Sequence, residues 1–183
     1  MDEKPEMTDE ALAHKVQSGD SSVFGVIVER YAERLTRYGR RYLAREEDIE
    51  DVIQDVFLRA YENIQSYNRE YRFSPWIYRI AHNAFVNVLR KQSKRSFEFF
   101  DFDTLISPLR HPEEEVGMLQ MTELLEEQLN TLAPKYREVI ILHYYENLSY
   151  EEIAEVLHVP IGTVGVRLKR AREELKKRVH TTS

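Results

Sequence analysis

The segment from residue 148 to residue 175 constrains the fold of this chain more than any other part of its sequence. Ser149 is followed three positions later by Glu152, a capping-box pattern that predicts the start of a short helix. The pattern then breaks at residues 158–160 and resumes as a basic amphipathic helix. The inward-facing apolar residues of the two helices are Ile153, Ala154 and Leu157, then Val164, Leu168, Ala171 and Leu175. This layout predicts a helix-turn-helix whose second helix is the candidate for recognition.

The rest of the chain also carries helical patterning and few residues that break helices. Six glycines and six prolines among 183 residues are too few for a loop-rich protein or a β-sandwich. Helical spacing of apolar residues predicts helices at about 8–17, 23–43, 52–60 and 75–91. In the last of these, the expected core stripe is Ile77, Ile80, Ala81, Ala84, Val88 and Leu89. We therefore expect an all-α protein.

A stretch with two prolines and no helical periodicity divides the patterned regions. It runs from residue 93 to residue 115, and its composition predicts a flexible linker. The sequence thus predicts two small helical domains, residues 1–92 and residues 116–183, with the helix-turn-helix in the second.

Charge is strongly segregated along the chain, although the formal net charge is only −6. Residues 46–62 hold seven acidic side chains against one arginine, whereas residues 65–95 hold seven basic side chains against one glutamate. Residues 160–180 form a second basic block, with seven lysines and arginines against two glutamates. The acidic block repels a phosphate backbone and the basic blocks attract it. Chance charge bias on solvated helix faces is the alternative for either basic block taken alone.

Several classes of function are not supported by the sequence. The chain has no cysteine, and no two of its six histidines stand at a metal-binding spacing. It has no glycine-rich phosphate loop, no nucleophile elbow and no coherent acid–base set, so we expect no enzyme activity, no metal and no cofactor. It also lacks a secretory signal and a long apolar run, which predicts a cytoplasmic protein without direct membrane insertion.

The basic helix near the C-terminus has a polar side that suits a major groove. Arginine can bond guanine, threonine can bond or touch a methyl group, and valine offers apolar contact only. The predicted base-reading residues are Thr163, Val166, Arg167 and Arg170, while Lys169 and Arg172 are expected to meet phosphate. The alternative is a helix that is basic because lysine and arginine suit helix C-termini.

Aromatic residues alternate with arginines in the first basic block. Stacking surfaces in a cationic field suit unpaired bases better than duplex DNA. The aromatic residues are Tyr67, Tyr71, Phe73, Trp76 and Tyr78, beside Arg69, Arg72 and Arg79. Arg79, Asn83, Val86, Asn87 and Arg90 fall on the side of the same helix that faces away from its apolar stripe. A single tryptophan next to an apolar stripe is more often a core residue, and the asparagines could be solvated amides.

Three motifs together resemble the extracytoplasmic-function (ECF, group IV) sigma factors of bacterial RNA polymerase. They are residues 50–61, residues 73–83 and residues 148–175, the last including Gly162-Thr163-Val164. The resemblance covers nearly the whole chain in the family's order. It implies a non-enzymatic subunit that directs core polymerase to promoters and initiates transcription by binding the −35 element as duplex and melting the −10 element.

The resemblance also assigns roles to individual residues. It implies core polymerase docking, on the clamp helices of the largest subunit, for Asp51, Gln54, Asp55 and Leu58. It implies −10 DNA binding for Tyr67, Phe73, Trp76, Arg79, Asn83, Asn87 and Arg90, with residues 65–74 as a pocket wall. It implies −35 DNA binding for Thr163, Val166, Arg167, Lys169, Arg170 and Arg172. Further implied partners are promoter DNA, the flap of the second-largest polymerase subunit and an anti-sigma factor.

One departure from the family pattern lies in the predicted recognition helix. Family members usually carry a basic residue and then a small polar one where this chain has Gly165 and Val166. A glycine inside a helix costs about 1 kcal/mol relative to alanine.

A second hypothesis from the sequence is a stand-alone helix-turn-helix regulator whose N-terminal domain dimerises or binds a ligand.

Overall fold

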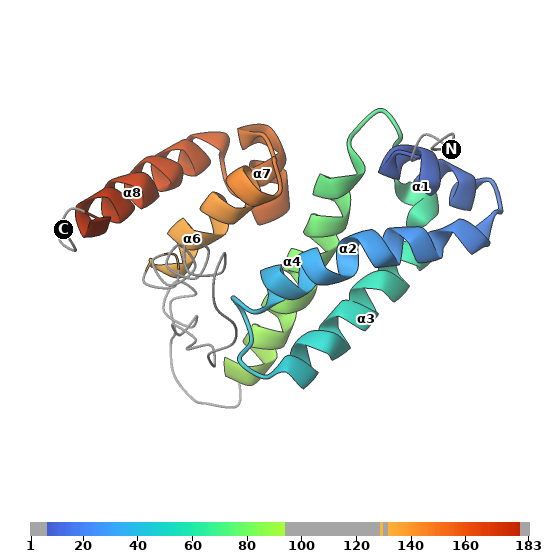
Figure 1. Cartoon of the computed structure of the whole chain (residues 1–183), viewed down its shortest axis with the longest axis horizontal. Helices are drawn as coiled ribbons and strands as arrows, with labels where there is room; N and C mark the ends of the chain where they lie inside the picture. Colours follow the sequence, from blue (N-terminus) through green and yellow to red (C-terminus); the bar gives the residue numbers. More distant parts are fainter. Residues whose placement is uncertain (1–6, 94–128, 130–131, 180–183) are drawn as a thin grey trace, which may run out of the picture. The chain divides into compact units, whose positions relative to one another are not determined.

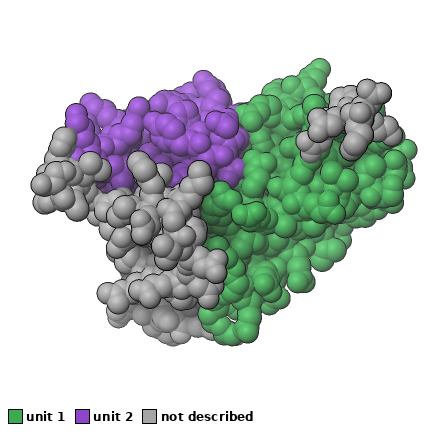
Figure 2. All heavy atoms as spheres, in the orientation of Figure 1, with its two compact units in different colours: residues 1–88 green, residues 89–183 purple. Residues whose placement is uncertain are grey.

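The computed structural model describes residues 7–93, 129 and 132–179, and all regular secondary structure among them is helical (Figure 1). The prediction of an all-α protein is therefore confirmed. The chain separates into two compact units, residues 1–88 and residues 89–183 (Figure 2). The sequence-based domain limits remain a prediction, since the proposed linker, apart from residue 93, lies outside the described part. None of the described helices is long and apolar enough to cross a membrane.

Unit 1 is a bundle of helices joined by short turns. Its elements are α1 (Asp9–Gln17), the 3₁₀ turn η1 (Ser21–Val23), α2 (Phe24–Gly39), α3 (Glu46–Glu62), the 3₁₀ turn η2 (Ile64–Ser66) and α4 (Phe73–Ser93), whose last turn passes the unit boundary. The sequence offers Thr8 or Asp9 as the cap of the first helix, and Thr8 takes that role, because its Oγ1 accepts a hydrogen bond from the Ala11 amide at 3.2 Å. Gly19 has a φ of 100°, which only glycine adopts readily, and it turns the chain from α1 towards α2.

Aromatic residues fill the centre of unit 1. Tyr31 and Tyr38 of α2 are fully buried, as are Tyr78 and Phe85 of α4. The expected stripe of α4 is only partly right, because Ile80 and Val88 are half-buried, whereas Tyr78 and Phe85 are fully buried. Val86, expected on the outward side, is also buried. Helix α2 approaches α4 closely at Gly39. A Cβ atom there would overlap the Phe85 ring and lie 3.0 Å from Ile49 Cγ2.

Unit 2 contains the predicted helix-turn-helix. Its described helices are α6 (Pro134–Ile140), the π-helical turn η3 (Ile141–Tyr145), α7 (Tyr150–Leu157) and α8 (Ile161–Val179). The capping box is confirmed, since the Ser149 amide donates to Glu152 Oε2 at 2.7 Å and the Glu152 amide donates to Ser149 Oγ at 3.2 Å. His158 then ends α7 in the left-handed conformation with a φ of 54°.

The apolar stripe of α8 packs inward as its spacing predicts. Val164, Leu168 and Ala171 are fully buried, whereas Leu175 is half-buried. In α7, Ile153 and Leu157 are buried, but Ala154 is only half-buried and Val156 takes a core position instead. The opposite side of α8 is thereby left to polar and basic residues.

Candidate nucleic-acid interface

Helix α8 carries all six predicted −35 contacts outside its buried stripe. Thr163 and Arg167 are half-buried, and Val166 is 52% exposed. The exposed basic members of the set are Lys169, Arg170 and Arg172. Thr163, Val166, Arg167 and Arg170 are three or four residues apart and lie along one side of α8, which a duplex groove can accept, whereas Lys169 and Arg172 lie further round the helix.

Two contacts hold this surface in place. Arg170 Nη1 donates to the hydroxyl of Tyr136 on α6 at 3.4 Å, and this hydrogen bond raises the pKa of the Arg170 guanidinium above its usual value. Arg172 Nε donates to the Leu168 carbonyl at 3.2 Å. Gly165 lies beside the Tyr150 ring, where an added Cβ would be 3.8 Å from Cε2, an ordinary van der Waals distance. Packing therefore does not require a glycine at this position.

Helix α4 presents a second exposed polar surface, in unit 1. Arg79, Asn83, Asn87 and Arg90 are all exposed and stand at spacings of three or four residues, which places them along one side of the helix. The buried residues Ile77 and Ala81 hold the other side in the core. The structure thus brings together the two amides and two arginines that the sequence predicts for −10 binding.

The other three predicted −10 residues lie in the core of unit 1. Tyr67, Phe73 and Trp76 are buried and pack against one another, with ring centroids 5.3–5.5 Å apart. Because these three rings are buried, they pack beneath the start of α4 instead of facing solvent. Tyr71, in contrast, is 67% exposed in the loop between α3 and α4. The sequence has no signal that separates Tyr71 from Tyr67, since both lie in the same short loop.

Helix α1 holds this α3–α4 loop, which comprises residues 63–72. Gln17 Nε2 donates to the carbonyl oxygens of Ile64 and Tyr67, each at 2.8 Å. The Phe73 amide at the start of α4 donates to Glu10 Oε1 at 3.0 Å. Burial, together with the negative charges of Glu10 and Asp9, raises the pKa of Tyr67 to about 12. None of these positioning contacts could be recognised from the sequence, because the partners are 47 to 63 residues apart.

The predicted docking residues form an exposed stripe along α3. Asp51, Gln54 and Leu58 are exposed, with Leu58 at 63%, and Asp55 is half-buried. Asp55 pairs with Arg59 at 2.7 Å one helical turn away. A single exposed leucine is normal on a protein surface, so the distinguishing feature of this stripe is its acidic charge.

The described part of the chain contains no group of three or more histidine, aspartate or glutamate residues arranged to hold a metal ion.

Comparison with known proteins identifies the family. The profile of sigma-70 region 2 matches residues 27–95, and that of sigma-70 region 4 matches residues 122–175. The ECF RNA polymerase sigma-E factor of Haemophilus influenzae is 34% identical over 183 residues, covering 95% of this chain and 96% of the relative. This chain belongs to the ECF sigma factors. ECF sigma factor SigW of Bacillus subtilis is also 34% identical, over 90% of this chain and 93% of its own length.

A solved sigma factor has the same fold. RpoE of Bartonella quintana, in complex with the anti-sigma factor NepR, matches 86% of this chain and 96% of its own with a TM-score of 0.67 and 26% identity. As an ECF sigma factor, the protein is a non-enzymatic transcription initiation factor that binds RNA polymerase and directs it to promoters.

Proposed function

We propose that this sigma factor divides promoter recognition between α8 and α4, and that α3 docks it on core polymerase. The observation that carries the proposal is the presence of two exposed basic helix faces, on α4 and on α8, and of a separate acidic face on α3 that DNA would repel. One face stands on a helix-turn-helix, and the other adjoins a loop with an exposed tyrosine.

Helix α8 reads the −35 element as duplex. Arg167 and Arg170 are placed to make paired hydrogen bonds to guanine, and Thr163 and Val166 to contact thymine methyl groups. Lys169 and Arg172 contact phosphates and set the position of the helix in the groove. Their contribution falls as salt rises, because phosphate contacts release counterions.

Helix α4 captures unpaired bases of the −10 element. Arg79, Asn83, Asn87 and Arg90 offer hydrogen bonds to base edges and phosphates, and Tyr71 offers an exposed ring. Stacking of about 1–3 kcal/mol per base offsets the few kcal/mol needed to extrude a nucleotide. Binding energy thereby drives melting. In this proposal Tyr67, Phe73 and Trp76 act by holding α4 and its loop rather than by touching DNA.

Protein contacts complete the assignment. The α3 stripe of Asp51, Gln54, Asp55 and Leu58 docks on the clamp helices of the largest polymerase subunit, and unit 2 meets the flap of the second-largest subunit. An anti-sigma factor is a further proposed partner, which would act by covering the same faces. The sigma factor from Bartonella quintana, solved with its anti-sigma factor, supports this part of the proposal.

Two alanine variants test the division of labour. We expect Arg167→Ala to impair formation of the closed complex, and Asn83→Ala mainly to impair opening, because only the second residue is assigned to unpaired bases. Closed complexes are measured by binding of the reconstituted holoenzyme to promoter duplex, and opening is measured by permanganate reactivity of thymines near the start site. Equal loss of closed complex in both variants would contradict the assignment.

The stand-alone regulator hypothesis makes a different prediction for the purified chain. It requires tight, specific binding to a palindromic duplex without polymerase and no association with core polymerase. A chain that binds duplex weakly by itself and specifically within the holoenzyme excludes that hypothesis.

A further inference from the structure

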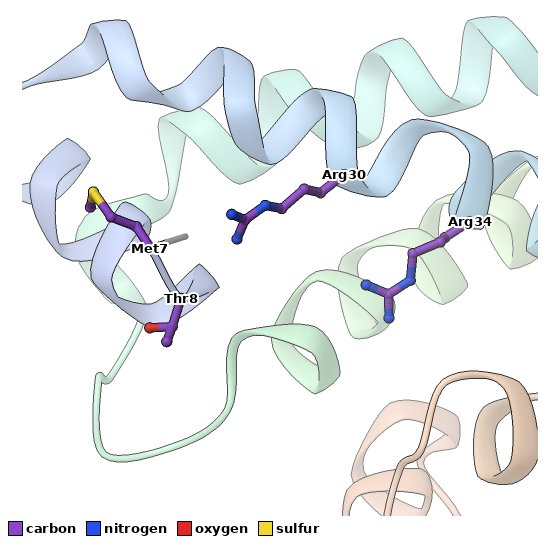
Figure 3. A pocket seen from close by; sticks show the side chains of 4 residues that line it. All are labelled: Met7, Thr8, Arg30 and Arg34. Carbon is purple, nitrogen blue, oxygen red and sulfur yellow. The ribbon is translucent and has the colours of Figure 1, made fainter. Parts of the chain in front are cut away.

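Arginine side chains of this protein have two kinds of partner. In unit 1, Arg30 pairs with the carboxylate of Asp9 at 2.6 Å. Figure 3 shows Arg30, with Arg34, extending from α2 at a surface hollow of about 450 Å³ that Met7 and Thr8 also line. A carboxylate partner orients the guanidinium and neutralises its charge at the same time.

Arg170 of α8 has a partner of the other kind. Within the described part of the chain its one hydrogen bond runs from Nη1 to the Tyr136 hydroxyl at 3.4 Å, and no carboxylate there pairs with it. The hydrogen bond to Tyr136 is the main cause of the raised pKa of Arg170, and attraction to Glu173 is a smaller one. Because a tyrosine hydroxyl is neutral at pH 7, it orients the guanidinium and leaves its positive charge and its other N–H donors for DNA.

The start of α6 holds Tyr136 in place. Pro134 occupies the first position of the helix, and the Tyr136 amide donates to the Ala133 carbonyl at 2.9 Å. The next residue, Arg137, is buried, and its Nη2 donates to the Leu132 carbonyl at 3.3 Å. Since α6 also packs against α8, the half-buried Tyr136 side chain stands at a fixed position beside the recognition helix.

A fixed hydroxyl changes what it costs Arg170 to bind a base. An exposed arginine samples many rotamers, and binding must select one of them at a cost in conformational entropy. A partner that already favours one arrangement lowers this cost. The distance of 3.4 Å is long for an N–H···O bond, so the hydroxyl guides the guanidinium without locking it.

We propose that the Tyr136 hydroxyl positions the Arg170 guanidinium for its base contact and thereby sharpens −35 specificity at one base pair. The inference rests on the function proposed for α8. Tyr136 is a positioning residue, which acts through Arg170 rather than by touching DNA. Its role concerns this one side chain, because the periodicity of α8 itself sets the rest of the face.

The test uses reconstituted holoenzyme and promoter duplexes whose −35 base pairs are replaced one at a time. Arg170→Ala identifies the base pair that Arg170 reads, as the one at which discrimination is lost. Tyr136→Phe keeps the ring and removes only the hydroxyl, and we expect it to reduce discrimination at that base pair about fivefold and at no other. Tyr144→Phe is the matched control, because Tyr144 is 51% exposed and its hydroxyl makes no hydrogen bond with the described residues.

The double variant Tyr136→Phe/Arg170→Ala separates positioning from direct contact. We expect it to behave like Arg170→Ala alone, since the hydroxyl acts only through that guanidinium. A further loss in the double variant would overturn the proposal, as would unchanged discrimination in Tyr136→Phe. An equal loss of affinity on every duplex would also overturn it, because that is the effect of a merely structural role. Failure of the proposed function is seen separately, as full discrimination at every −35 base pair in Arg170→Ala.

Discussion

The two helices proposed to contact DNA are supported in different ways. Helix α8 is a self-contained surface: a buried stripe of Val164, Leu168 and Ala171 on one side and basic residues on the other. The α4 surface depends on distant segments, because Gln17 and Glu10 of α1 hold the adjoining loop and Gly39 of α2 admits the Phe85 ring.

This difference has a functional logic. A helix that enters the groove of intact duplex needs only a rigid face, which helical periodicity provides by itself. A surface that captures extruded bases needs a helix and a loop in a fixed relative position. Long-range hydrogen bonds and close packing hold them in that position. Changes far from DNA should therefore affect −10 function more than −35 function.

The largest effect is expected at the contact between α2 and α4. Gly39→Ala places a methyl group against the fully buried Phe85 ring, which cannot move aside without disturbing the core. We expect a loss of about 3 kcal/mol in the free energy of unfolding of unit 1, measured by denaturant titration of the full chain. Gly25→Ala on the same helix is the control, since no atom lies within 4 Å of its added Cβ. Equal stability of the two variants would show that α4 can move away from α2 without loss of stability.

A smaller effect is expected at the α1–loop contact. Gln17→Ala leaves the carbonyls of Ile64 and Tyr67 without their side-chain donor, at a cost of about 2 kcal/mol in stability. We expect the same variant to open promoters less efficiently, as measured by permanganate reactivity, while holoenzyme binding to the −35 duplex is retained. Ser18→Ala is the matched control, because its hydroxyl bonds only within α1, to the His14 carbonyl at 2.9 Å. A variant that opens promoters normally would remove the proposed link between α1 and −10 function.

The smallest effect is expected in unit 2 and has the opposite sign. Gly165→Ala adds a methyl group that meets Tyr150 at an ordinary distance and removes the helix penalty of glycine. We expect unit 2 to gain about 1 kcal/mol in stability, measured by thermal unfolding, with unchanged affinity for −35 duplex. Loss of that affinity would instead assign Gly165 a direct role in the approach to DNA, and the self-contained description of α8 would be incomplete.

Features that depend on near neighbours in the chain were predicted well. The Thr8 cap, the Ser149–Glu152 capping box and the α8 stripe all involve partners within one or two helical turns, so the sequence contains the complete interaction. The exposed set on α4 was predicted for the same reason. The placement of the aromatic rings was not, because Tyr67 and Tyr71 have the same local pattern and opposite burial.

The sequence by itself determined which segments are helical, where several of them begin, and how charge is divided among them. Only the tertiary structure decided which aromatic residues enter the core, that α1 holds the loop before α4, and that Arg34 of α2 lies over the Tyr78 ring of α4. The physical reason is the range of the forces involved. Helical periodicity and capping act over three or four residues, whereas these other choices depend on contacts between segments about fifty residues apart, which no local pattern specifies.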